Sequence, residues 1–223
     1  MTPPEIEVVR HARARRMRLA VDLRDGRVKL TLPPRASLKK ALAWAEEQRG
    51  WIATQQARLP EGQPLAPGAT IPLAGREVTI AWSDTGPRTL RLDGDQLICG
   101  GSLEGLARRV ERWLKAEALR VLSADTAEYA ARAGVVVTRV SVGDPKGRWG
   151  SCASSGAIRY SWRLILAPPM VRRATVAHEV AHRIHMNHSA AFHQAVAALF
   201  EGEPDAAREW LRRNGAGLHW VGR

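Results

Sequence analysis

The sequence predicts an α+β protein made of two parts, and three observations lead to this prediction. Short runs of alternating apolar and polar residues, separated by Gly, Pro and Asp-Gly turns, recur through the first hundred residues. Two longer segments, near residues 102–132 and 170–185, repeat apolar residues at helical spacing. Further strand-like runs lie between them. We therefore expect a strand-rich unit with one long helix over residues 1–100 and a second, mixed domain over residues 101–223, with the boundary at Gly100-Gly101.

The composition is that of a folded protein. An apolar fraction of 45% over 223 residues argues against disorder and permits a packed core. No run of about 18 apolar residues is present, so we expect no membrane span. The first residues lead into charged ones rather than into an apolar signal segment, and Cys99 and Cys152 are too few for a disulfide scaffold. These features predict a cytoplasmic protein.

The formal net charge of +12 raises the question of an anionic partner. Nucleic acid and nucleotides both fit this charge. A compositional explanation fits as well, because arginine far outnumbers lysine and alanine is abundant, as in chains from GC-rich genomes. The sequence contains no RNA-binding signature, zinc finger or recognisable helix-turn-helix. We therefore treat nucleic-acid binding as a minor alternative.

The elements expected in the first part begin with a β-hairpin. Residues 17–21 and 28–32 alternate apolar and polar side chains around an Asp25-Gly26 turn. The arginine-dense segment 8–18 is interpreted mainly as a solvated face. Ser37 is a good N-cap for a helix over residues 38–59, which Gly50 interrupts. Further strands are expected near residues 70–73, 77–82, 89–92 and 96–99.

In the second part, Gly134 ends the helix that starts near Ser102. The β-branched run 135–142 and the run 157–166 are expected to be strands, with a turn at 153–156 before the second. Pro168-Pro169 suits the start of the helix over residues 170–185. That helix is apolar on more than one side, which predicts that it is buried.

This helix carries His178-Glu179-Val180-Ala181-His182, a helical zinc motif. Residues four apart lie on one face with an axial offset of about 6 Å. Two imidazoles at this offset can converge on one ion at Zn–N distances of about 2.0–2.1 Å. Glu179 can then reach a water on the open side of the ion. The motif predicts zinc as cofactor, His178 and His182 as metal ligands, and Glu179 as the catalytic base.

A catalytic zinc site takes three protein ligands and leaves one position open. His185 lies about 10.5 Å along the helix axis from His178, too far for both to share one ion. We therefore expect the helix to end, with Asn187 in the left-handed conformation, and His188 to fold back as the third ligand. Ser189 would cap the next helix, over residues 190–200. His193 is the substitute ligand, and Glu201 is also weighed.

Two groups of residues give the chain a resemblance to a known family. The first is Arg148-Trp149-Gly150-Ser151-Cys152, Ile158-Arg159 and Trp162 to Pro168. The second is the His178–His182 motif followed by Met186-Asn187-His188-Ser189 and Phe192. In this order they resemble the YgjP-like family of metal-dependent hydrolases, relatives of SprT-like and other zincin metallopeptidases. The resemblance is strong from about residue 136 onward, and the first hundred residues look similar to longer members.

The resemblance implies a minimal zincin fold, in which a small mixed sheet packs on the metal-bearing helix and the substrate cleft follows an edge strand. It also supports His178, His182 and His188 as ligands and Glu179 as general base. The chain departs from the family pattern at His193, where members often have a large aromatic residue, and at Arg183, where many are apolar.

We expect a zinc-dependent hydrolase of the metallopeptidase type, acting on a peptide or protein. The alternative, implied by the resemblance, is a nucleoside triphosphate (UTP) pyrophosphatase that uses the same metal site. A nucleic-acid-binding module with a structural zinc is a third reading, which Glu179 opposes because a structural site needs no base. The sequence leaves the oligomeric state open.

The charge that develops on the substrate oxygen needs a hydrogen-bond donor besides the metal. Arg148, Tyr160, Arg163 and His193 are the candidates. A packed turn beside the cleft is an equally good role for Arg148 and Trp149. Cys152 is expected to be a buried thiol, with a resting-state fourth ligand as the alternative.

Overall fold

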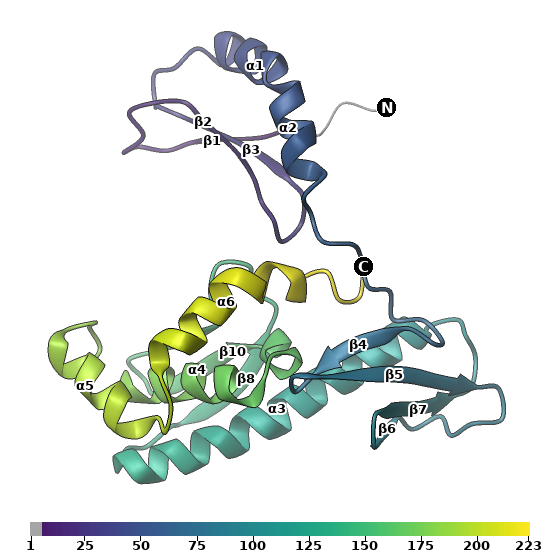
Figure 1. Cartoon of the computed structure of the whole chain (residues 1–223). Coiled ribbons are helices and arrows are strands. Elements are labelled where there is room, and N and C mark those ends of the chain that lie inside the picture. The colour runs from purple at the N-terminus through teal and green to yellow at the C-terminus, as the bar shows by residue number, and fades with distance from the viewer. Residues whose placement is uncertain (1–5) are drawn as a thin grey trace. The chain divides into compact units, whose positions relative to one another are not determined.

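The computed structural model describes residues 6–223 and has an α+β architecture (Figure 1). In this range the chain forms three small mixed sheets and six α-helices. It divides into two compact units, Met1–Glu61 and Gly62–Arg223. The α+β class predicted from the sequence is confirmed. The division falls after Glu61, however, and not at Gly100-Gly101 as expected.

The first unit contains a three-stranded sheet in the order β1-β3-β2. The strands β2 (Arg18–Val21) and β3 (Val28–Leu32) form the predicted antiparallel hairpin, and Gly26 adopts a φ of +74° in its turn. Strand β1 (Ile6–Arg10) was not expected, and it pairs parallel with β3. It is an edge strand in which three of five side chains are exposed and Val8 and Val9 are adjacent, so it lacks the apolar alternation that marks a half-buried strand.

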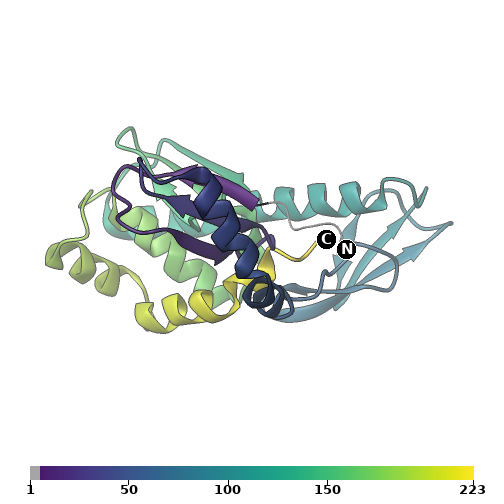
Figure 2. The same ribbon diagram turned by 90° about the horizontal axis from the view of Figure 1, so that it is seen from above.

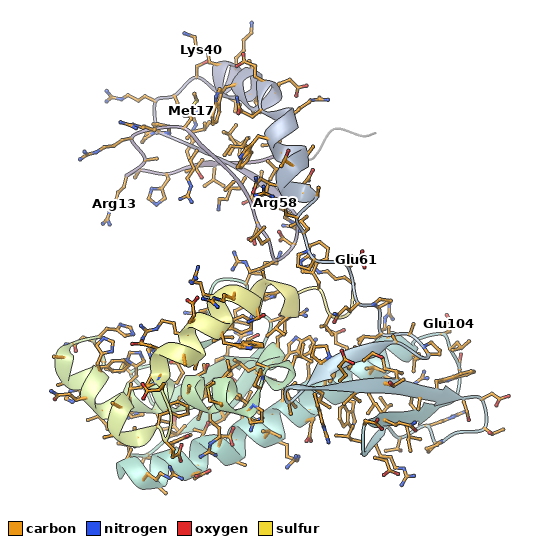
Figure 3. The ribbon with its side chains drawn as sticks, viewed as in Figure 1. Arg13, Met17, Lys40, Arg58, Glu61 and Glu104 are labelled. Atoms are coloured by element: carbon orange, nitrogen blue, oxygen red, sulfur yellow. The ribbon has the colours of Figure 1, made fainter. Side chains whose placement is uncertain are left out.

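The arginine-rich loop between β1 and β2 is exposed, in agreement with the solvated face expected there. Arg13 extends outward from this loop (Figure 3). Arg10 instead turns back onto the unit, where its guanidinium donates hydrogen bonds to the carbonyls of Pro33 and Pro34 at 3.2 and 2.7 Å.

The helix expected over residues 38–59 is two helices, α1 (Leu38–Glu47) and α2 (Arg49–Gln56). They meet at Gln48, whose N–H donates to the carbonyls of Trp44 and Ala45 in a tightened turn. Ser37 caps α1 as predicted, since its hydroxyl accepts a hydrogen bond from Lys40 N. The core of this unit is formed by Leu30, Leu32, Ala41 and Ala45.

The second unit begins with a four-stranded sheet in the order β4-β5-β7-β6. Its strands are β4 (Thr70–Leu73), β5 (Arg76–Ser83), β6 (Arg91–Asp93) and β7 (Gln96–Gly100). Buried residues of this sheet, among them Ile80 and Leu97, share one hydrophobic core with Val110 and Leu114 of helix α3 (Leu106–Ala133). This shared core explains why the chain does not divide at residue 100.

Helix α3 runs along the second unit from the four-stranded sheet to α5, as Figures 1 and 2 show. Gly134 ends it in the left-handed conformation, as predicted. The second sheet of this unit has the order β8-β10-β9, with strands β8 (Arg139–Gly143), β9 (Gly150–Cys152) and β10 (Ala157–Ser161). The strand expected over residues 157–166 ends at Ser161, because Trp162–Leu166 forms a buried 3-10 helix, η1.

Three helices complete the fold: α4 (Pro169–Ala181), α5 (Ala190–Leu199) and α6 (Pro204–Leu218). Helix α4 is central, since it packs against α3, α5, α6 and β9. Helix α6 was not anticipated, and Gly215 and Gly217 weaken its helical signal in the sequence. Over residues 6–223, no helix combines the length and apolarity needed to cross a membrane.

Candidate metal centre

The histidine motif lies at the C-terminal end of α4. The helix ends at Ala181, four residues before the expected end at His185, and His182 is its C-cap residue. The next two N–H groups close tighter turns, from Arg183 N to Val180 O at 2.8 Å and from Ile184 N to Ala181 O at 2.9 Å. The early end lets the chain turn back at once toward the two histidines.

His178, His182 and His188 lie together, and one nitrogen from each falls within 4.8 Å of the other two. Nε2 of His178 lies 3.3 Å from Nε2 of His188. Two nitrogens bound at about 2.0–2.1 Å to one tetrahedral ion are about 3.3–3.4 Å apart, so this spacing fits a shared ion. Imidazole nitrogen is also a donor that zinc prefers. The three histidines could therefore hold a metal ion.

The rings of this group are held by their neighbours. Nδ1 of His182 lies 3.2 Å from the carbonyl oxygen of His185, so a proton on Nδ1 leaves Nε2 free for a metal. The ring of His182 stacks on buried Phe192, with centroids 4.5 Å apart. His185 thus takes part through its backbone, in agreement with its exclusion as a ligand.

The turn after α4 differs in one respect from the prediction. Asn187 does not adopt the left-handed conformation; Ala74 is the only non-glycine residue among 6–223 with a positive φ. Asn187 acts through its side chain instead, since its Oδ1 accepts a hydrogen bond from Ser189 N at 3.3 Å. Ser189 then caps α5 as expected, through its hydroxyl and Phe192 N.

Glu179 is 6% exposed and lies next to the histidine group on α4. Burial raises the pKa of its carboxyl group to about 7, and the positive charge of Arg148 opposes that rise. The carboxylate packs against the backbone of β9, where a Cβ atom on Gly150 would lie 2.5 Å from Oε1. A glycine at this position is therefore needed for Glu179 to hold its place.

Burial also affects the first histidine. Burial, together with positive charge at His182, His188 and Arg208, lowers the pKa of His178 to about 4. The imidazole of His178 is thus neutral near pH 7, which is the form that binds metals. Cys152 is half-buried, and burial raises the pKa of its thiol. It does not belong to the histidine group.

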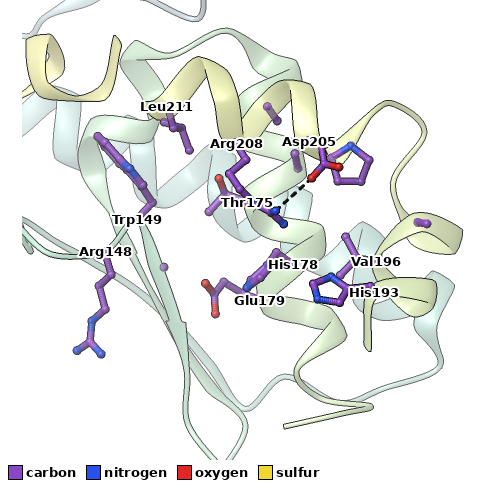
Figure 4. Close-up of a pocket in the computed structure, with 15 residues that line it drawn as sticks. Arg148, Trp149, Thr175, His178, Glu179, His193, Val196, Asp205, Arg208 and Leu211 are labelled. Atoms are coloured by element: carbon purple, nitrogen blue, oxygen red, sulfur yellow. Dashed lines mark ion pairs between the residues drawn. The ribbon is translucent and has the colours of Figure 1, made fainter. Parts of the chain in front are cut away.

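A cavity of about 640 Å³ opens onto His178 and Glu179 (Figure 4). Its size lies within the usual range of about 300–1,000 Å³ for ligand sites. One wall is formed by Arg148, Trp149 and Gly150, at the start of β9. The other walls come from α4, α5 and α6, with Thr175, Val196 and Arg208 among the lining residues. The wall from α6 was absent from the sequence analysis, because no local pattern links residues 204–211 to the motif on α4.

The structure divides the four candidate hydrogen-bond donors to the substrate oxygen into two pairs. Arg148 and His193 line the cavity, whereas Tyr160 and Arg163 do not. The Tyr160 hydroxyl is buried and lies 3.0 Å from Oγ1 of Thr126. Arg163 binds Asp144 at 2.7 Å and the carbonyl of Leu218 at 2.7 Å, which ties the end of α6 to the body of the unit. Tyr160 and Arg163 therefore stabilise the fold and do not face a substrate in the cavity.

The structure also shows where the two alternative ligands, His193 and Glu201, lie. The ring of His193 lies 6.4 Å from that of His188, at the cavity wall and outside the histidine group. Glu201 accepts a hydrogen bond from the Tyr129 hydroxyl at 2.6 Å and pairs with Arg132 and Arg173. Its carboxylate therefore joins α3 and α4 instead of facing the histidines.

Fold and site together define an α+β protein in which the C-terminal end of the central helix and the turn after it bring together three histidines able to hold a metal ion, beside a buried carboxylate. Residues 15–214 match the family model described as "YgjP-like, metallopeptidase domain". The chain therefore belongs to the YgjP-like metallopeptidase domain family, and the predicted resemblance is confirmed. Searches of curated proteins and of solved structures found no match.

Proposed function

We propose that this protein is a zinc-dependent peptidase with a minimal zincin-like fold. In this proposal His178, His182 and His188 hold the zinc ion, and Glu179 is the general base. The family assignment supports a metallopeptidase, and the spacing of the three imidazoles supports a tetrahedral ion.

The observation that carries the proposal is the position of β9. This strand is at the edge of the sheet β8-β10-β9, and its first residue, Gly150, lies against Glu179 and lines the cavity. An extended peptide that pairs with an edge strand is held through its main chain, largely independently of its sequence. A peptide paired with β9 would place its backbone carbonyls beside His178 and Glu179.

A zinc ion at such a site supplies a Lewis acid that lowers the pKa of bound water and polarises the bond under attack. The protein must supply the proton transfers. Glu179 is suited to them, because a carboxyl group with a pKa of about 7 both takes and returns a proton near neutral pH. In the proposed reaction its carboxylate receives a proton from the attacking water and passes it to the leaving amine nitrogen.

Two further cavity residues are candidates for binding the substrate oxygen as negative charge develops on it. Arg148 and His193 line the cavity on opposite sides of His178 and Glu179 (Figure 4). Both carry N–H donors, and donors aimed at a developing charge are a main source of catalysis. Of the four candidates from the sequence, these two have access to a substrate in the cavity.

Hydrolysis of nucleoside triphosphates is the second candidate function. The observation that favours it is the presence of two arginines, Arg148 and Arg208, in the lining of the cavity. Guanidinium groups bind phosphate as readily as carboxylate. A phosphoanhydride bond would then take the place of the peptide bond beside Glu179.

A substrate panel separates the two functions. The purified full chain, stripped with a chelator and then reloaded with one equivalent of zinc, is incubated with casein and, separately, with ATP, CTP, GTP and UTP. We expect zinc-dependent release of peptides from casein. Release of pyrophosphate or phosphate from the nucleotides without cleavage of casein would contradict the peptidase proposal and favour the second candidate.

A further inference from the structure

We propose that Arg208 on α6 determines substrate specificity by binding a carboxylate of the peptide near the bond that is cut. This inference rests on the proposed peptidase function. The histidine motif ends well before α6, and the family description assigns no role to a residue of this helix.

Arg208 is placed to meet a substrate. It lines the cavity together with His178, and its side chain extends from α6 toward Thr175, one turn of α4 before His178 (Figure 4). Its side chain is 65% exposed, so its guanidinium can be reached from solvent. A group bound there lies inside the same cavity as the histidine site.

Arg208 is only loosely held by the protein. Within residues 6–223, its guanidinium forms an ion pair with Asp205. Nη1 of Arg208 lies 3.1 Å from Oδ1 of Asp205 (Figure 4). The Asp205 side chain is 89% exposed, and exposed i,i+3 pairs of this kind contribute little to stability. A ligand carboxylate can therefore replace Asp205 at small cost and form a two-pronged hydrogen bond with the guanidinium.

The surroundings favour a carboxylate over a basic group at this place. The neighbours of Arg208 on α6 that line the cavity include the apolar residues Ala207 and Leu211. The other lining carboxylate besides Asp205 is Glu179, which is buried against Gly150. A peptide carboxylate has two sources, an Asp or Glu side chain and the free C-terminus, and both have the chemistry required.

The ion pair between Arg208 and Asp205 allows a test in which two variants should change peptide binding in opposite directions. If Asp205 competes with the substrate carboxylate for Arg208, Asp205→Asn should strengthen binding of acidic peptides, whereas Arg208→Ala should weaken it. The chain offers a matched control one turn further along α6. Arg212 forms the same kind of i,i+3 pair with Glu209, is 71% exposed and does not line the cavity.

Binding is measured by fluorescence anisotropy with the zinc-loaded Glu179→Gln protein, so that no peptide is consumed. The probes are labelled alanine-based hexapeptides: one with an internal Glu and an amidated C-terminus, one with Gln in its place and the same amide, and one with Gln and a free C-terminus. We expect the Glu peptide or the free-acid peptide to bind about tenfold more tightly than the amidated Gln peptide, the factor expected for one charged hydrogen-bonded contact.

The peptide that shows this gain identifies the source of the carboxylate. The gain should vanish in Arg208→Ala, persist in Arg212→Ala and grow in Asp205→Asn. Equal binding of all three peptides, or the same loss in Arg212→Ala as in Arg208→Ala, would overturn the inference.

Cleavage separates this inference from the proposed function. Mass spectrometry of casein digests shows whether Asp, Glu or a free C-terminus is enriched near the bonds cut by the protein with its native Glu179, and whether Arg208→Ala removes that enrichment. Cleavage without enrichment overturns the role of Arg208 and leaves the peptidase standing. Carboxylate-dependent binding without zinc-dependent cleavage supports the role of Arg208 and overturns the peptidase.

Discussion

Glu179 packs so tightly against Gly150 that a single methyl group on Gly150 would lie 2.5 Å from Oε1 of the carboxylate. This contact connects the edge strand β9, along which we place the peptide, with the residue proposed as general base. Bound peptide and base are therefore positioned by the same backbone.

Gly150→Ala tests this contact. The added methyl group must displace Glu179, and a shift of about 1 Å at a catalytic group lowers rates by about a hundredfold. We expect kcat for casein-derived peptides to fall by that order, while the zinc content stays at one per chain because the histidines lie outside the clash. Gly147→Ala is the control, since a methyl group there meets no atom within 4 Å. An unchanged kcat in Gly150→Ala would contradict the proposed role of Glu179.

The choice of His188 as third ligand is tested by metal analysis of two single variants. His188→Ala removes one of the three nitrogens that lie within 4.8 Å of one another, so we expect zinc to be lost on dialysis. His193→Ala leaves that group intact and should retain the metal. Retention by His188→Ala with loss by His193→Ala would reverse the assignment.

Metal removal should lower stability. An ion bound only by the folded chain stabilises it by about 4 kcal/mol when free metal exceeds its Kd about a thousandfold. We therefore expect a chelator to lower the Tm, measured by calorimetry at neutral pH, and equimolar zinc to restore it. His182→Ala, which removes a ligand, should show no such shift. A chelator effect of equal size in both proteins would argue against a histidine-bound ion.

Acid should weaken the contacts between α3 and α4 through Glu201. Hydrogen bonding from Tyr129, aided by Arg132 and Arg173, lowers the pKa of Glu201 to about 2. A carboxyl group with a lowered pKa stabilises the fold above its unfolded pKa of about 4.3, and this contribution is lost as pH falls toward 2. Glu201→Gln should therefore unfold at lower urea concentration at pH 7, with the difference from the unaltered chain shrinking between pH 4 and pH 2. A difference that stays constant over this range would contradict the account.

Arg163 is predicted to be structural. Lysine keeps the charge but cannot bind Asp144 and the carbonyls of Leu218 and Val221 together, as the guanidinium does. We expect Arg163→Lys to lower the free energy of unfolding by about 2–3 kcal/mol, the scale for lost charged hydrogen bonds. Its specific activity per folded, zinc-loaded protein should stay close to normal. Loss of activity without loss of stability would return Arg163 to the list of catalytic candidates.

The centre of the site follows from local rules. The rise of an α-helix is enough to pair His178 with His182 and to exclude His185, and the N-cap preference of Ser189 marks where the chain resumes a helix. His188 then follows as the residue in the corner. The structure places all three histidines together, although α4 ends sooner than its pattern suggests and Asn187 turns the chain through its side chain.

The rest of the cavity depends on contacts between residues far apart in the chain, which spacing does not reveal. In the sequence, nothing distinguishes Gly150 from other glycines. Only the structure shows that Glu179 fills the space that a side chain at this position would need. In the sequence, Arg208 is one of many arginines. The packing of α6 against α4 is what brings it to the same cavity as His178. The apolar run 162–166 is equally consistent with a strand and a buried 3-10 helix, so its backbone form could not be read from hydrophobicity.

The most direct test of the central claim compares the full chain with Glu179→Gln at equal zinc content. Initial rates of casein cleavage are measured near pH 7, with zinc per chain determined for each sample. We predict one zinc per chain in both proteins and a rate about 10²–10⁴-fold lower in Glu179→Gln, the range that a general base contributes. Equal rates at equal zinc content would contradict the assignment of Glu179 as the base of a zinc peptidase.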